Sequence, residues 1–395
     1  MSIDYKAIVE QGKATCTFPE ELAYTEPYTG SWTFHKTISV ISAILAGFTI
    51  LICISNIMRH LNNFSCAVEQ RQIVRIILTP IVFSICNLIG ILKYDAAGYS
   101  KPVAELFEAI PLIGAFLLFI AFAVGASASR SGAVNAYFED LPRRRMLGRN
   151  KLKHEFGSLR WFYLHYILVF QILPSRIALT IAEWAVHANA CPLDEIPTGL
   201  SVSSAIVMVM WIVGTLRFYR RLRELLKPRN AYLKMFSFKL IVLVQIIQEP
   251  LLSGLLSSGI LKPTEKVSYK DWKYGLPAFC VVVEMLLFSI LFLFSFSARE
   301  YCHTGPDAEG LVIARQPELP FAKALVHSLD LSDILKGCFW HKQFIAVCFP
   351  EKAGLRRSKR EEQDTEMLQP PPPGYVKDHT PDRDDASESP KMSGS

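Results

Sequence analysis

Long runs of apolar residues recur along the chain, and a polar stretch separates each run from the next. A helix needs about 20 apolar residues to cross a hydrocarbon core of about 30 Å. Seven runs meet that length, so the pattern predicts an all-α integral membrane protein with seven transmembrane helices. The predicted spans are residues 33–58, 73–92, 106–128, 161–182, 199–218, 236–258 and 276–298.

Positive charge alternates from one loop to the next. The loops after the first, third and fifth spans are basic, with clusters such as Arg143–Arg145 and Arg220–Arg223. The loops on the other side carry few or mixed charges, and only residues 262–273 are mildly basic. Because basic loops stay in the cytoplasm, we expect the N-terminus outside and the C-terminus inside.

The second span begins with a charged segment, EQRQIVR at residues 69–75, that runs directly into apolar sequence. A basic edge of this kind is typical of the cytoplasmic start of a membrane helix. We therefore expect Arg71 and Arg75 to lie among the lipid headgroups while Ile76 and the residues after it enter the hydrocarbon.

The spans divide the chain into four predicted parts. Residues 1–32 are an extracytoplasmic segment without a cleavable signal peptide, and residues 33–300 form the seven-helix domain. Residues 301–350 are a cytoplasmic juxtamembrane segment. Within it, apolar residues recur among lysines over 321–349, which predicts either a helix along the inner leaflet or a helix packed on the loops below the bundle.

The remaining residues, 351–395, form a tail of charged residues, prolines and serines whose composition is typical of disorder. Within it, Pro372, Pro373 and Tyr375 match the PPxY pattern, which docks as an extended helix on WW domains. The interpretation is either a recruitment site for a WW-containing ubiquitin ligase or a chance match.

Composition narrows the class of protein. Half of the residues, 51%, are hydrophobic and the mean hydropathy is +0.25, which is too apolar for a soluble domain of 395 residues. The net charge of +6 does not indicate nucleic-acid binding, because the basic runs flank apolar spans. Of nine cysteines, Cys16 and Cys191 fall on predicted outer segments, where a disulfide between them is feasible.

The sequence also lacks the common catalytic signatures. The sequence contains no HExxH, GxSxG or Walker-type glycine loop and no paired-cysteine metal motif. We therefore expect no enzyme activity, no cofactor, no metal site and no coupling to ATP.

Ionisable and amide side chains within the spans are candidates for function, because such groups are costly in hydrocarbon. At about 1.5 Å per residue, the three charged residues Arg176, Glu249 and Glu284 lie roughly 9–13 Å below the outer ends of their spans. The hypothesis is an outward-opening cavity in which Arg176 binds an anionic headgroup. When the cavity is empty, Glu284 is the counter-ion of Arg176. The alternative is a closed structural ion pair. The predicted lining residues are Glu108, Arg176, Gln245, Gln248, Glu249 and Glu284.

Several motifs resemble the organic solute transporter alpha-subunit (Ost-alpha) family over residues 34–339. Glu69, Gln70, Arg71 and Arg75 match the family's EQRxIVR signature, and Lys239 with Gln248 is similar to its KFxxIK…WQ segment. Further similar elements are Phe107–Ala109, Glu284–Met285 and Leu331–Ile334. Ile247 stands where the family often has Trp, which indicates a divergent member, and the style of the tail suggests a fungal one.

The resemblance implies a carrier for amphipathic organic solutes, such as organic anions and sterol- or lipid-like molecules, moving down a gradient. The alternatives are a seven-span receptor, which has the same topology, and a membrane-trafficking organiser without transport activity. Expected partners are membrane lipids, the solute and either a second copy or a separate small single-span subunit. The sequence does not decide between the plasma membrane and an endomembrane such as the vacuole.

Overall fold

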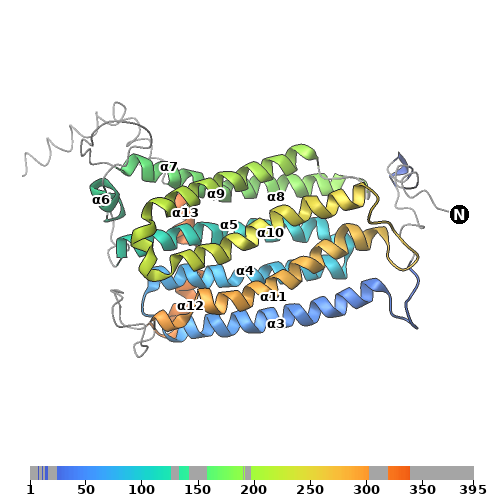
Figure 1. The fold of residues 1–395 in the computed structure, drawn as a ribbon, viewed down its shortest axis with the longest axis horizontal. Helices are drawn as coiled ribbons and strands as arrows, with labels where there is room; N and C mark the ends of the chain where they lie inside the picture. Colours follow the sequence, from blue (N-terminus) through green and yellow to red (C-terminus); the bar gives the residue numbers. More distant parts are fainter. Residues whose placement is uncertain are drawn as a thin grey trace, which may run out of the picture. The chain divides into compact units, whose positions relative to one another are not determined.

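The computed structural model describes residues 25–125, 133–141, 158–189, 191, 197–301 and 319–338, together with residues 8, 11 and 14–16. Helices make up most of these residues (Figure 1), and their only β pairings are two isolated bridges, Thr29–Trp32 and Thr264–Val267. Pro372, Pro373 and Tyr375 lie outside the described residues. The long helices are α3 (Phe34–Asn62), α4 (Ala67–Leu92), α5 (Tyr94–Val124), α7 (Leu159–Phe170), α8 (Ile172–Asn189), α9 (Thr198–Leu226), α10 (Ala231–Ser257) and α11 (Leu276–Ser295).

Short elements complete the described chain. They are α6 (Ala133–Asp140), η2 (Lys227–Arg229), η3 (Asp271–Gly275), η4 (Ala298–Tyr301), α12 (Phe321–Leu329) and α13 (Ser332–Cys338). All of the described elements belong to one unit of the chain, Met1–Phe344.

Six helical stretches of the described chain are long and apolar enough to cross a membrane. They are α3, α4, α5, α7 with α8, α9 with η2, and η3 through α11 to η4. The predicted sixth span, 236–258, falls on α10, whose apolar part Leu243–Ser257 is shorter. Six of the predicted spans therefore each fall on one long helix and the fourth on two consecutive helices, and the chain is a multi-pass helical membrane protein.

The long helices run alongside one another (Figure 1). We call the end at which α3 ends and α4 begins the basic end, because Arg59 and Arg229 lie there with the arginines of α4. α4 packs between α3, α5 and α11, and its Ile73 and Ile77 are completely buried. By contrast, Leu51 of α3 and Phe294 of α11 are 66% and 71% exposed, as expected of side chains that face lipid.

The fourth predicted span is divided into two helices. α7 ends at Phe170 and α8 begins at Ile172, with Gln171 between them. Pro174 lies in the first turn of α8 and has no N–H to donate to the carbonyl of Phe170, four residues earlier. The break between the two helices therefore falls where the proline removes a helical hydrogen bond.

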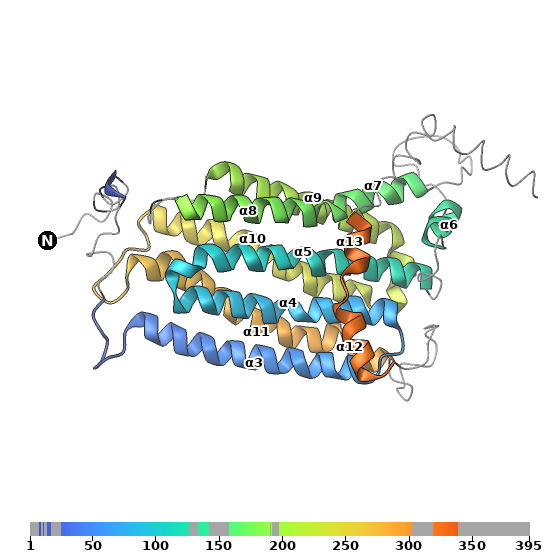
Figure 2. The same ribbon diagram turned by 180° about the vertical axis from the view of Figure 1, so that it is seen from behind.

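After the seventh predicted span, the described chain resumes at Leu319 and forms α12 and α13, which run across the long helices near the basic end (Figure 2). α12 contacts α3 and α4, and α13 contacts α5. The segment therefore packs on the helices themselves and, through His327 against Phe64, on the α3–α4 connection. Its exposed side includes Val326 and Leu329, which are 70% and 53% exposed, so contact with the inner leaflet remains a prediction.

Cys16 and Cys191 form a disulfide with Cα atoms 5.0 Å apart, which confirms that these two cysteines pair. The bond ties the N-terminal segment to the connection between α8 and α9. Cys53, Cys66, Cys86, Cys280 and Cys338 are free thiols.

Candidate functional site

The EQRxIVR signature occupies the first turns of α4, and Gln70 holds the α3–α4 connection together. Its side-chain nitrogen donates to the carbonyls of His60 and Asn63, at 3.2 and 2.7 Å. Its side-chain oxygen accepts a hydrogen bond of 2.8 Å from the backbone N–H of Cys66. Gln70 is fully buried and satisfies backbone groups that a helix end would otherwise leave unpaired.

Glu69 joins α4 to two other elements at the basic end. Its carboxylate pairs with Arg229 of η2 and accepts a 2.8 Å hydrogen bond from the hydroxyl of Tyr301 in η4. Close by, the ammonium group of Lys234 donates to both carboxylate oxygens of Glu300, at 2.6 and 2.8 Å. Glu69 therefore fixes α4 to η2 and η4, and the Lys234–Glu300 pair fixes α10 to η4.

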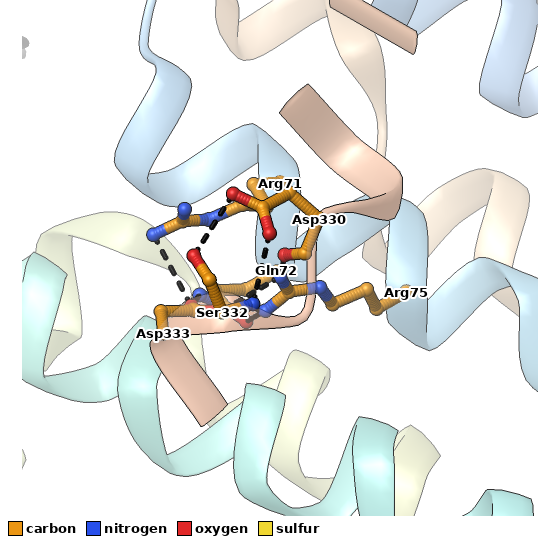
Figure 3. A network of polar contacts seen from close by, with 6 residues as sticks. All are labelled: Arg71, Gln72, Arg75, Asp330, Ser332 and Asp333. Atoms are coloured by element: carbon orange, nitrogen blue, oxygen red, sulfur yellow. Dashed lines mark hydrogen bonds and ion pairs between the residues drawn. The ribbon is translucent and has the colours of Figure 1, made fainter. Parts of the chain in front are cut away.

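Arg71 and Arg75 bind the segment that follows the seventh predicted span (Figure 3). Arg75 donates through both terminal nitrogens to the carboxylate of Asp333, at 2.8 and 3.0 Å, and also binds the carbonyl of Asp330. Arg71 lies 3.1 Å from the same carboxylate. Gln72 donates to it at 2.9 Å and accepts from Arg75 at 2.8 Å. We call Arg71, Gln72, Arg75, Asp330, Ser332 and Asp333 the motif cluster.

The motif cluster corrects the expectation that Arg71 and Arg75 lie among lipid headgroups. Arg75 is 1% exposed and Arg71 is largely buried, because Asp333 supplies the counter-charge that lipid phosphates were expected to supply. Burial alone would raise the pKa of Asp333, but the hydrogen bonds and positive charge of the arginines outweigh it and hold the pKa below its ordinary value. The carboxylate is therefore ionised when bound.

Local structure presents Asp333 to the arginines. The backbone N–H and hydroxyl of Ser332 donate to the carboxylate of Asp330, both at 2.9 Å, and these bonds lower the pKa of Asp330. Gly337 then allows α13 to approach α7 closely, since a Cβ there would lie 2.3 Å from the ring of Phe170. Two motifs far apart in the sequence, residues 69–75 and 331–334, thus form one junction.

In a different part of the bundle, Arg176 bridges three helices. It is 4% exposed and lies on α8. One terminal nitrogen binds Glu105 of α5 at 2.6 Å and Ser204 of α9 at 2.7 Å, and the other lies 3.9 Å from Glu108 of α5. The predicted counter-ion Glu284 is therefore wrong: α5, not α11, carries the acids beside Arg176. The arrangement fits the alternative of a structural ion pair, with different acidic partners.

The other predicted lining residues lie on the neighbouring helices α10 and α11. The side-chain nitrogen of Gln248 donates to the carbonyl of Pro277 at 3.2 Å and sets the register of the pair. Among the described residues, three buried side-chain atoms here find no hydrogen-bond partner: the nitrogen of Gln245, the oxygen of Gln248 and one carboxylate oxygen of Glu284. The side chains of Glu249 and Lys239 lie outside the described residues. We call Gln245, Gln248 and Glu284 the open face.

The contacts thus divide the predicted cavity residues into two groups, with Glu108 and Arg176 in one and the open face in the other. The sequence analysis missed Glu105 and Ser204 as partners of Arg176, and Arg229 and Tyr301 as partners of Glu69. Glu105 lies three residues before Glu108 on the same helical face, a spacing that could have identified it. Within the described ranges, no group of three or more His, Cys, Asp or Glu side chains is arranged to hold a metal ion.

Comparison with known proteins supports the motif resemblance. The profile of the family described as "Organic solute transporter Ostalpha" matches residues 38–301. The chain is 25% identical over 317 residues to vacuole membrane protein hfl11 of Schizosaccharomyces pombe, covering 76% of this chain and 69% of that one. It is also 25% identical over 268 residues to vacuole membrane protein HFL1 of Saccharomyces cerevisiae, covering 67% and 60%.

No solved structure matches this chain. The family profile nevertheless spans the long helices from α3 to η4, including the signature on α4 and the open face on α10 and α11. The chain therefore belongs to the organic solute transporter alpha family of multi-pass membrane proteins.

Proposed function

We propose that this protein carries amphipathic organic solutes across an endomembrane, down their gradient and without ATP. The observation that supports the proposal most is the open face, where three buried polar atoms on α10 and α11 lack partners. Buried polar groups are normally hydrogen-bonded, and leaving one unpaired costs about 1–3 kcal/mol. A ligand that satisfied these atoms would recover that free energy.

The chemistry of the open face defines the polar end of the solute. Gln245 offers a donor, while Gln248 and Glu284 offer acceptors. A solute with hydroxyl groups satisfies this set better than a purely anionic one, because a hydroxyl both donates and accepts, whereas an anionic group only accepts. Among the predicted substrates, the hydroxylated sterol- or lipid-like solutes therefore fit best.

The same two helices can accommodate an apolar body. Ile247 and Leu251 on α10 are 57% and 56% exposed, and Leu287 on α11 is 60% exposed. An amphipathic solute could lie along these side chains from the lipid side while its polar end reaches the open face. Movement through the lipid-facing surface requires no water-filled channel.

The proposal assumes seven spans, with α10 as the sixth and the N-terminus outside. α10 then enters from the cytoplasm and α11 returns to it, so the open face lies in the outer half of both helices. The names of the two yeast relatives support a vacuolar or related membrane. A separate small subunit and a WW-domain ligase at residues 372–375 remain predictions.

Flux from proteoliposomes tests the proposal. The full chain would be reconstituted with an entrapped radiolabelled hydroxysteroid or steroid sulfate, without ATP. We expect efflux of the hydroxysteroid, reduced at least about tenfold in a Gln245→Leu/Glu284→Leu variant because two hydrogen-bonding groups are lost. Asn87→Leu is the matched control, since the amide of Asn87 binds only its own helix, at the Phe83 carbonyl.

A second candidate function is a membrane organiser without transport activity. The docking of α12 and α13 favours it, because the family signature there holds a segment in place instead of lining a solute path. Equal leakage from empty and protein-containing vesicles, for both probes, would contradict the carrier. Missorting of the cargo of that membrane on deletion of residues 319–395 would then support the organiser.

A further inference from the structure

A hollow of about 190 Å³ lies at the basic end, where α3 and α11 finish. A water molecule occupies about 30 Å³, so the hollow has room for a group several times larger. It is lined by Asn56, Arg59, Asn63, Leu293, Ser297, Ala298 and Arg299. The lining therefore contains two guanidinium groups, two amides and a hydroxyl, and no carboxylate.

The two arginines of the hollow differ from the arginines of the bundle interior. Arg75 and Arg176 are buried and each binds a carboxylate. Arg59 and Arg299 are exposed, and no acidic partner is recorded for either within the described residues. Their charge is therefore available to an anion from outside the chain.

The place of the hollow indicates where that anion comes from. Arg59 lies in the last turn of α3, and Arg299 lies just after α11 in η4. The predicted spans end at residues 58 and 298, so both guanidinium groups lie at headgroup level. One turn deeper, Ile54 of α3 and Phe294 of α11 are 47% and 71% exposed and would contact acyl chains.

We infer that this hollow binds the phosphomonoester head of an anionic phospholipid. Such a group carries about −1.5 to −2 charges at neutral pH, which matches two arginines, and guanidinium groups bind phosphate through paired hydrogen bonds. Asn63 and Ser297 provide further polar contacts at the wall of the hollow. The site is separate from the open face and does not depend on solute transport.

Native mass spectrometry of the full chain in a neutral detergent tests this inference. The probe is dioleoylphosphatidic acid, with dioleoylphosphatidylcholine as the neutral comparison. We expect selective retention of phosphatidic acid, weakened at least about tenfold in Arg59→Gln/Arg299→Gln because two charge-assisted contacts are lost. Arg220→Gln removes one exposed arginine on α9 outside the hollow and should leave retention unchanged.

A second variant separates the hollow from general electrostatic attraction. Ser297→Trp fills the space and keeps both arginines, so we expect the same loss of phosphatidic acid with an unchanged melting temperature. Undiminished retention in either hollow variant, or equal retention of the neutral lipid, would overturn the inference. Binding of glycerol 3-phosphate as tight as that of phosphatidic acid would also overturn it, since the acyl chains would then contribute nothing and the ligand would be a soluble phosphate.

Discussion

The basic end of α4 and the α10–α11 pair both bury polar side chains, but they use them in opposite ways. In the motif cluster, the Asp333 carboxylate receives bonds from Arg71, Gln72 and Arg75. In the open face, three buried atoms of Gln245, Gln248 and Glu284 bind no partner in the part of the chain that the structure describes. The first arrangement stabilises the fold, whereas the second leaves hydrogen-bonding capacity for something else.

This contrast shows that a residue of the family motif need not be a residue that contacts the solute. The EQRxIVR signature is the most recognisable part of the sequence, and its residues hold segments together: Gln70 the α3–α4 connection, Glu69 the elements η2 and η4, and Arg75 the α13 segment. Most hydrogen-bonding groups of these residues are already paired, the Nε atoms of Arg71 and Arg75 excepted, so they have little left to offer a solute. The site of solute contact is therefore expected where pairing is incomplete.

The largest predicted effect comes from removing Asp333. Asp333→Ala leaves two buried guanidinium groups without a counter-charge, and breaking a buried pair in this way costs about 3–5 kcal/mol. We expect α12 and α13 to leave the bundle. Cys338 at the end of α13 is a half-buried free thiol, so its labelling by a maleimide, mapped by peptide mass spectrometry, should become much faster.

Two further variants test the cause of that effect. Gly337→Val should release α13 with all charges intact, because its Cβ would overlap the ring of Phe170. Arg75→Met in the Asp333→Ala background should recover part of the docking, since one unpaired charge is removed. Unchanged labelling of Cys338 in all three variants would mean that the motif cluster does not hold the segment.

The sequence predicted the helices better than it predicted the polar contacts between them. Hydropathy located the helices well, because the need for about 20 apolar residues acts along the chain. Pairing across the bundle was not predictable, because it depends on which helices are neighbours. Arg176 was assigned to Glu284, yet its acids lie on α5, and the partner of Arg75 lies 258 residues away.

The start of α4 shows that ion pairs between distant parts of the chain can also change where a helix begins. The second span was predicted to begin at residue 73, where the apolar run starts, but α4 begins at Ala67. Glu69, Arg71 and Arg75 can lie inside a buried helix because Arg229, Tyr301 and Asp333 neutralise or bind them. The helix therefore extends through a segment that hydropathy alone places outside it.

A smaller effect of opposite sign is expected at the open face. Glu284→Leu removes a buried carboxylate oxygen without a partner. We expect the free energy of unfolding to increase by about 1 kcal/mol, which would be measured as a higher melting temperature in detergent. Gln248→Leu is the contrasting control, because it also removes the 3.2 Å bond to Pro277 and should not stabilise. A lower melting temperature for Glu284→Leu would indicate that the carboxylate is bound by the protein.

The smallest effect concerns pH and tests whether the motif cluster is as closed as its contacts indicate. His327 of α12 packs edge-on against Phe64, with ring centroids 6.1 Å apart. Burial lowers the pKa of His327, and the nearby charge of Arg71 lowers it further, so the docked ring is neutral. Once released, the ring takes up a proton near its ordinary pKa of about 6.5, so docking should weaken as the pH falls from 7.5 to 5.5.

The lowered pKa of Asp333 acts only at lower pH, because that carboxylate stays ionised until the pH approaches the ordinary range of Asp, about 4. Hydrogen exchange of the α12 backbone, taken as the ratio of wild type to His327→Phe, should increase on acidification, and a constant ratio would exclude His327 as the cause of any pH dependence.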